Sequence, residues 1–338
     1  MKLPTIPVAV LVMVCVLGVA RSGEAQCLPE DGVRFVCGPV NPEDLAAVPG
    51  SPWVIVSGYE VDGYLYATDT RTHRSMPLFP TSSFLSRPDP SFSDCAGPVT
   101  AGFQPHGLSL RPGSRGTHTL YVVRHGAREA VEVFEVDARG AQPSLTWVGC
   151  VVVPEGVTLN SVAALPGAGF AVTHFNLSAG ELLEWQPDTG WATVPGSETE
   201  GPNGLVASPD GRWFYIAAWP TRSLIRLSRG QTPVQRDVLD IGFHVDNIRW
   251  APDGSLLAAG HLGRDGVEAI IACLSQRQCE GMTSRVARVD PERLTAEEII
   301  RYPSNEHFFL GTVALQVQDE IWLGGIGGAD RIVRFPAP

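Results

Sequence analysis

Residues 203–219 read NGLVASPDGRWFYIAAW, and residues 246–261 read DNIRWAPDGSLLAAGH. In each stretch a polar residue opens a short apolar run, a turn with Pro-Asp-Gly follows, and a second apolar run completes the unit. Two apolar runs that flank such a turn are typical of antiparallel strands. The two turns, at Pro209 and Pro252, lie 43 residues apart. The chain therefore repeats one antiparallel unit.

Similar turns occur in the rest of the chain. Three carry Pro-Gly, and a sixth has lost its proline; they lie at Pro49, Pro112, Pro166 and near Gln318. Successive prolines are 63, 54, 43 and 43 residues apart, a period that indicates four-stranded propeller blades. Six such units fill the chain after its N-terminal segment and leave no room for a second domain. We therefore predict an all-β fold, a six-bladed β-propeller that forms a single domain over residues 26–338.

The N-terminal segment has the features of a secretory signal. Lys2 precedes an apolar run at residues 7–20, and the small residues Gly23 and Ala25 occupy the −3 and −1 positions of a cleavage site. We interpret residues 1–25 as a signal peptide; an uncleaved N-terminal anchor is the alternative. No later segment is long and apolar enough to span a bilayer. We therefore expect the mature chain to be secreted or periplasmic, without a membrane span.

Charge and cysteines agree with that location. The formal net charge is −11, which disfavours nucleic acid as a partner because like charges repel. Beyond the signal six cysteines remain, an even number that favours disulfides in an exported protein. Six cysteines permit 15 pairings. Cys273 and Cys279 bracket a short polar stretch that they could staple, and we expect Cys27–Cys37 and Cys95–Cys150 as the remaining pairs.

Counting five or six residues back from each turn leads to the start of the innermost strand of each blade. These positions are all polar, on strands that otherwise read apolar: Glu43, His106, Asn160, Asn203, Asp246, Asn247 and Thr312. One such residue is an ordinary cap. In a propeller, however, the starts of the innermost strands converge on one axis, where isolated polar groups would be costly. We therefore expect these side chains to share a partner in the central channel.

The partner that fits is a divalent metal. Five of the positions offer only oxygen ligands, namely Glu43, Asn160, Asn203, Asp246 and Asn247. Calcium takes six to eight oxygen ligands in a flexible geometry. Magnesium demands tighter octahedral geometry, and zinc or copper would require histidine or thiolate. The sequence thus predicts one Ca²⁺ at the bottom of the channel.

Four histidines are candidates for chemistry or for lining the pocket. His106 lies in register with the metal ligands, and His125 ends the following strand, so the two imidazoles should meet over the metal. We predict that they are catalytic. His174 and His261 end equivalent strands, and for them a structural role that shapes the pocket is the better interpretation. Thr312 should line the same pocket.

At these residues the chain resembles the paraoxonase family of calcium-dependent lactonases and arylesterases. More distantly it is similar to gluconolactonase and strictosidine-synthase-like propellers. The motifs are PHGLSL at His106, LYVVRHG at His125, NSVAAL at Asn160, GPNGLVASPDG at Asn203 and VDNIRWAPDG at Asp246. The resemblance implies the calcium ligands and the histidine pair given above. It also implies a second, structural calcium that would use Asp44 and an acid at position 161; because Ser161 stands there, we do not expect that second site.

The function expected is hydrolysis of a lactone or an activated aryl ester. The metal would polarise the carbonyl, and His106, assisted by His125, would activate a water. Two alternatives remain. One is a non-catalytic propeller that binds a ligand or protein and keeps the metal for stability, and the other is a sugar lactonase of the gluconolactonase type. Residues 76–98 are expected to form a flap over the channel.

Overall fold

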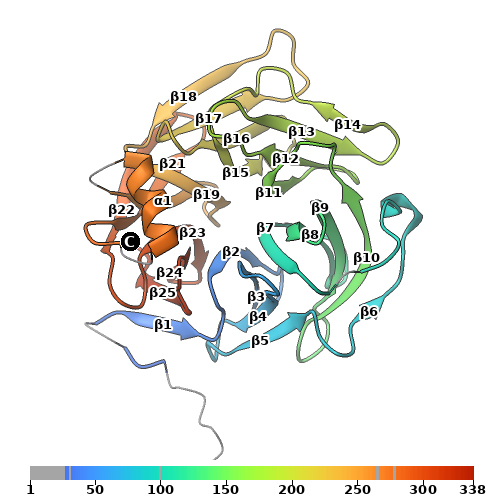
Figure 1. The fold of residues 1–338 in the computed structure, drawn as a ribbon, viewed down its shortest axis with the longest axis horizontal. Coiled ribbons are helices and arrows are strands. Elements are labelled where there is room, and N and C mark those ends of the chain that lie inside the picture. Colours follow the sequence, from blue (N-terminus) through green and yellow to red (C-terminus); the bar gives the residue numbers. More distant parts are fainter. Residues whose placement is uncertain (1–26, 30–31, 99, 264–265, 277–278) are drawn as a thin grey trace, which may run out of the picture.

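The computed structural model describes residues 27–29, 32–98, 100–263, 266–276 and 279–338. The predicted signal peptide, residues 1–25, lies outside these residues. Six sheets are arranged radially around a central channel (Figure 1), and their strands pair antiparallel except for one short strand of the second sheet. The predicted all-β, six-bladed propeller is thereby confirmed.

The strands of each blade are named here in order from the channel outward. Blade 1 contains β2 (Pro42–Ala47), β3 (Trp53–Gly58), β4 (Leu65–Asp69) and β5 (Ser75–Phe79). Blade 2 contains β7 (Phe103–Arg111), β8 (Thr117–Gly126), β9 (Ala130–Asp137), β10 (Ser144–Val152) and β6 (Leu85–Ser86). Blade 3 contains β11 (Leu159–Ala164), β12 (Phe170–His174), β13 (Glu181–Gln186) and β14 (Gly190–Thr193).

Blade 4 contains β15 (Pro202–Ala207), β16 (Trp213–Ala218), β17 (Ser223–Ser228) and β18 (Arg236–Asp240). Blade 5 contains β19 (His244–Trp250), β20 (Leu256–Leu262), β21 (Thr283–Asp290) and β22 (Thr295–Pro303). Blade 6 contains β23 (Leu310–Val317), β24 (Glu320–Ile326), β25 (Arg331–Pro336) and β1 (Arg34–Cys37). A short 3-10 helix, η1 (Pro90–Phe92), and an α-helix, α1 (Gly266–Gln276), complete the elements.

The predicted turns fall where the repeat placed them. Each of the five prolines lies between the innermost strand of a blade and its second strand, and Gln318 occupies the same turn in blade 6 with a φ of +56°. The turn residues therefore punctuate the chain in the way that the sequence indicated.

Blades pack against each other through both faces of every sheet. Along β3, Val54 and Val56 pack against apolar side chains of blade 6, whereas Ile55, which points the other way, packs against those of blade 2. This alternation follows from the two-residue period of a strand. Because both faces are covered, apolar residues occupy both, and burial of these layers provides the main favourable contribution to folding.

The ring is closed by a strand from the start of the described chain. β1 pairs antiparallel with β25, with Arg34 opposite Arg334 and Cys37 opposite Arg331. Cys37 also forms a disulfide with Cys27. Blade 6 thus combines three C-terminal strands with one N-terminal strand.

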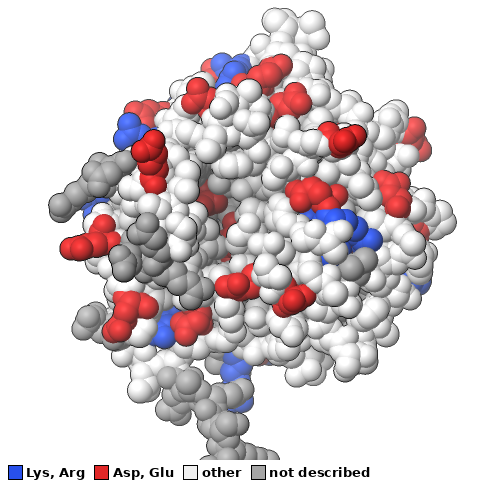
Figure 2. Space-filling model, viewed as in Figure 1, with Lys and Arg blue, Asp and Glu red and all other residues white. Residues whose placement is uncertain are grey.

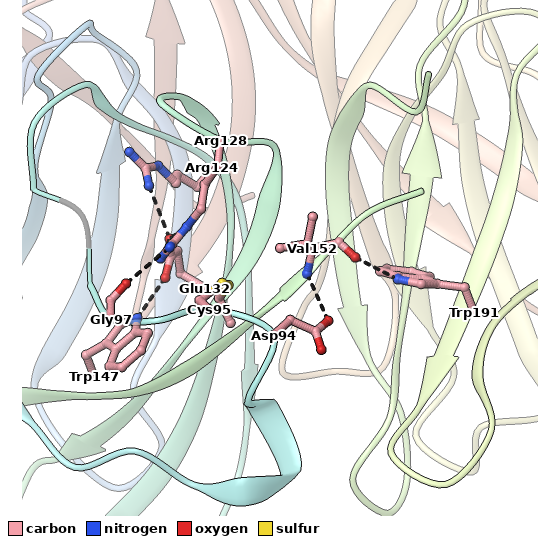
Figure 3. Close-up of a disulfide and its surroundings, with 10 residues drawn as sticks. Asp94, Cys95, Gly97, Arg124, Arg128, Glu132, Trp147, Val152 and Trp191 are labelled. Atoms are coloured by element: carbon pink, nitrogen blue, oxygen red, sulfur yellow. Dashed lines mark hydrogen bonds and ion pairs between the residues drawn. A yellow bond between two sulfur atoms is a disulfide. The ribbon is translucent and has the colours of Figure 1, made fainter. Parts of the chain in front are cut away.

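All three predicted disulfides are present: Cys27–Cys37, Cys95–Cys150 and Cys273–Cys279. Beside the second one, Glu132 accepts hydrogen bonds from Arg124, Arg128 and Trp147 (Figure 3). Arg124 also donates to the carbonyl oxygen of Gly102, and Arg128 donates to that of Gly97. This network fastens the segment that precedes β7 to blade 2.

The expectation of a flap at residues 76–98 is wrong. β6, in the middle of this segment, is the outermost strand of blade 2 and pairs in parallel with β10 (Figure 1). The Cys95–Cys150 disulfide holds the rest of the segment against β10. The segment therefore widens blade 2 and does not cover the channel.

The helix α1, which sequence periodicity did not indicate, lies between β20 and β21 in the chain (Figure 1), and it packs with Leu310 at the start of β23. Ile270 and Cys273 of α1 pack with Trp219, Met282 and Phe309. In the described part of the chain, no helix has the length and apolar character needed to cross a membrane.

Candidate functional site

Every innermost strand has a register shift near its start, and the predicted polar positions lie in these shifts. In β2 the shift separates Pro42 from Asp44 and contains Glu43. The equivalent shifts of β7, β11, β15, β19 and β23 contain His106, Asn160, Asn203, Asp246 with Asn247, and Thr312. A β-bulge interrupts pairing and re-aims a side chain. Six bulges in register therefore direct six sets of polar groups toward the channel.

Two glycines allow the bulges of neighbouring blades to approach closely. A Cβ atom on Gly107 would lie 2.6 Å from the carbonyl oxygen of Asn160, and one on Gly204 would lie 2.3 Å from that of Asp246. Both distances are too short for any other residue. The PHG and PNG sequences thus fix the separation of adjacent inner strands at the site.

The five predicted metal ligands are brought together at the start of the inner strands. Glu43 and Asn247 are each 1% exposed, and Asn247 Nδ2 donates to Glu43 Oε1 over 2.6 Å. Asn203 hydrogen-bonds to Asp246. Four oxygens of this cluster are buried and without a hydrogen-bond partner: Glu43 Oε2, Asn160 Oδ1, Asn203 Oδ1 and Asn247 Oδ1.

Such oxygens are rare in native proteins, because a buried polar atom without a partner costs about 1–3 kcal/mol. All four are acceptors, the kind of atom that a bound cation would satisfy. Burial also raises the pKa of Glu43 well above its ordinary value and that of Asp246 to about 8, so both carboxyls would hold a proton at neutral pH unless a nearby positive charge favoured their ionised form. Calcium fits this donor set in charge and in ligand type.

Among the described residues there is no group of three or more His, Cys, Asp or Glu side chains that could hold a metal. The cluster contains only two carboxylates, since its other members are asparagines. A calcium site here consequently depends on amide oxygens.

Asp44 and Ser161, the two positions considered for a second calcium, both have other partners in the structure. Asp44 is fully buried. It accepts a hydrogen bond from Leu108 N (2.6 Å) and forms an ion pair with Arg249. Ser161 Oγ accepts from Leu205 N over 3.2 Å. Asp44 and Ser161 thus play the same part, each binding the backbone of the next blade, and both are already engaged.

The two catalytic candidates contact each other as predicted. His106 Nδ1 lies 2.9 Å from His125 Nε2, and His106 Nε2 lies 3.6 Å from Glu43 Oε1. Burial, and next the proximity of His125, hold the pKa of His106 well below its ordinary value. His106 is therefore neutral, and it lies at the edge of the oxygen cluster.

The structure adds a carboxylate to this pair. His125 Nδ1 lies 2.8 Å from Glu129 Oε2, and Glu129 Oε1 accepts a hydrogen bond from Leu159 N over 2.6 Å. Because an ionised carboxylate only accepts, His125 must carry its proton on Nδ1. When His125 carries this one ring proton, its Nε2 accepts from His106 Nδ1–H, which leaves a lone pair on His106 Nε2, the ring nitrogen 3.6 Å from Glu43 Oε1.

Tyr59 is a second residue that the sequence did not indicate. Its ring centroid lies 4.4 Å from that of His106 and 6.1 Å from that of His125. Burial, with a smaller effect from Glu43, raises the pKa of Tyr59 to about 12. Tyr59 thus forms a neutral wall against the histidine pair.

The pocket-lining candidates differ in their surroundings. His261 accepts a hydrogen bond from Trp219 Nε1 (3.1 Å) on Nε2, so its Nδ1–H donates to Gly311 O (3.2 Å). Burial lowers its pKa to about 4, consistent with a neutral structural residue. Thr312 is fully buried and donates to Glu43 O over 2.7 Å. His174, half-buried at the end of β12, pairs in register with Leu159 and Glu181.

The centre of the ring is open on the face shown in Figure 2, where a hollow contains acidic side chains in its depth and at its rim. His125 lies near the end of β8, and α1 follows β20; both strands are the second strands of their blades. Because second strands run antiparallel to the innermost strands, His125 and α1 lie at the end of the channel where the innermost strands start. We call this end the mouth.

Comparison with known proteins places the fold. No family model matches the sequence, and no curated protein matches it. A luciferin-regenerating enzyme is similar in structure, with a TM-score of 0.55, 11% identity, and coverage of 90% of this chain and 95% of that chain. A calcium-binding protein, regucalcin, from Agrobacterium tumefaciens strain C58 is similar with a TM-score of 0.54 and 13% identity. The match covers 89% of this chain and 93% of that chain.

A chain of a nidogen–laminin complex gives a TM-score of 0.51 and 11% identity, and covers 82% of this chain and 94% of its own length. These likenesses show the fold alone. They include one enzyme, one calcium-binding protein and a chain of a protein complex, and they do not separate a paraoxonase-type propeller from the others.

Proposed function

We propose that this protein is a calcium-dependent hydrolase of lactones or activated esters. One observation carries the proposal: four unpartnered buried oxygens lie next to a chain of hydrogen bonds that leaves an unprotonated nitrogen, Nε2, on His106. A cation site and a general base side by side are what ester hydrolysis requires. A propeller of similar fold, regucalcin, is described as calcium-binding, which is consistent with this proposal.

The residues proposed to hold calcium are Glu43, Asn160, Asn203, Asp246 and Asn247. When bound, the ion would supply a Lewis acid for the substrate carbonyl and a positive charge for the developing oxyanion.

The proposed base is His106. Its Nε2 takes a proton from water, and the hydroxide so generated attacks the carbonyl carbon. The resulting imidazolium keeps its Nδ1–H bond to His125, and Glu129 at the far end offsets the positive charge. Tyr59 and the protein around it exclude solvent from one face of His106. His106 then returns the proton to the leaving alkoxide, which completes the cycle.

Location belongs to the same proposal. Three disulfides are typical of proteins outside the cytoplasm. We infer export, to the periplasm or the medium.

The test is hydrolysis of δ- and γ-lactones, an acyl-homoserine lactone, phenyl acetate and gluconolactone by EDTA-treated protein, with and without added calcium. Calcium-dependent turnover supports the proposal, and preference for gluconolactone would favour a sugar lactonase. Calcium binding without turnover of any substrate would refute the enzyme and leave a binding module.

Substitution of His106 separates catalysis from calcium binding. His106→Gln should abolish most turnover, on the order of 10²–10⁴-fold, while calcium binding persists. His73→Gln is the matched control, because His73 lies in the turn between β4 and β5, the two outer strands of blade 1.

A further inference from the structure

A buried guanidinium crosses the channel below the oxygen cluster. Arg249 lies on β19, two residues beyond Asn247, and only 10% of its side chain is exposed. Two residues advance a strand by about 7 Å, so Arg249 lies one step deeper in the channel than the proposed ligands. From the inner strand of blade 5, the side chain of Arg249 extends to the inner strands of blades 1 and 2.

Arg249 is bound on all sides. Its Nε donates to Leu45 O over 2.9 Å, Nη1 donates to Ile248 O over 2.8 Å, and Nη2 donates to Leu108 O over 3.0 Å and to Asp44. Leu45 belongs to blade 1 and Leu108 to blade 2. One side chain from blade 5 therefore ties together the inner strands of two blades on the other side of the channel.

The charges of the channel then balance in a simple way. Three carboxylates, Glu43, Asp44 and Asp246, are buried there with one guanidinium. Arg249 neutralises Asp44, which leaves two negative charges among the proposed ligands. One divalent cation offsets both.

We propose that Arg249 is a fixed internal cation, which closes the channel beneath the site and limits it to one divalent ion. This inference rests on the calcium site of the proposed function for its stoichiometry, though not for the pairing of Arg249 with Asp44. The ligand and the substrate must then enter from the mouth, because the guanidinium and its partners fill the channel below.

Isothermal titration of EDTA-treated protein with calcium tests the charge. We expect one ion per chain for the unaltered protein. In Arg249→Met the repulsion between the guanidinium and the ion is lost, so calcium should bind at least about tenfold more tightly. Arg249→Lys keeps the charge and should leave the affinity close to that of the unaltered protein. The matched control is Arg334→Met, which breaks an equally buried pair with Glu320 outside the channel and should not change the affinity.

Thermal unfolding without metal tests the pairing independently. Arg249→Met leaves Asp44 buried without a positive partner, with only backbone N–H groups as donors, and should lower Tm by several degrees; Asp44→Asn added to it should restore most of the loss. No recovery in the double variant, or unchanged calcium affinity in Arg249→Met, would overturn the inference. Absence of calcium binding by the unaltered protein would refute the metal site and the stoichiometry, and recovery in the double variant would then support the pairing alone.

Discussion

Replacement of Glu129 by glutamine should reverse the direction of the hydrogen-bonded chain that ends at His106. Leu159 N–H requires an acceptor at one terminal atom of residue 129, and in the unaltered protein His125 Nδ1–H requires an acceptor at the other. Glutamine has only one oxygen. If that oxygen stays on Leu159 N, the amide nitrogen donates to His125 Nδ1, and both histidines shift tautomer. His106 Nε2 then carries a hydrogen and is not a base.

The opposite amide orientation preserves the base but places two donors, the amide and Leu159 N–H, against each other. A buried peptide N–H without an acceptor costs about 1–3 kcal/mol. The active arrangement thus becomes the minor one, and kcat should fall by about tenfold to a hundredfold, since each 1.4 kcal/mol is about a factor of ten. KM and calcium affinity should not change.

The assay is steady-state hydrolysis of the best substrate of the panel, together with calcium titration of the same preparation. Glu135→Gln is the control, because Glu135 lies on β9, the strand that begins directly after Glu129, but pairs with Arg87 on the outside of blade 2. An unchanged kcat in Glu129→Gln, or a loss that calcium titration explains fully, would refute the tautomer reasoning.

Three further predictions concern stability. Calcium should raise the Tm of EDTA-treated protein, by the equivalent of about 4 kcal/mol at a concentration 1,000 times Kd, and Asn203→Ala should reduce this rise in a thermal-shift assay. Gly204→Ala should lower both Tm and calcium affinity because its Cβ meets the backbone of blade 5 at 2.3 Å, whereas Gly97→Ala, with nothing within 4 Å, should change neither. Removal of the Cys95–Cys150 disulfide, which spans 55 residues, should lower the free energy of unfolding by roughly 4 kcal/mol in denaturant titration; an unchanged midpoint would contradict this.

The sequence predicted those features that local signals mark. Proline and glycine turns depend on the chemistry of a few adjacent residues, so the blades and the positions counted back from the turns could be found. The metal-ligand candidates were found for the same reason, because each lies at a constant distance from a turn. Even the bulges have a trace in the sequence, the glycine after His106 and after Asn203.

Features that depend on pairing between distant strands were missed. Arg249 reads as one charged residue in an apolar strand, and only the register of blades 1 and 2 shows that it meets Asp44. Glu129 lies in the short turn between β8 and β9, three residues after the end of the strand that carries His125. That closeness in sequence was the one signal from which its contact with His125 could have been predicted. Residues 76–98 were misplaced because β6 pairs with β10, about sixty residues further along the chain.

The closing strand has a consequence for folding. Asn247 and Glu43 are 204 residues apart in sequence, and β1 cannot pair with β25 before the last blade exists. Contacts of such long range form late and slowly. The cluster of oxygens is consequently complete only when the ring is complete, so calcium affinity reports whether a chain has finished folding. During refolding, uptake of the ion should coincide with the final phase and not with the formation of individual blades.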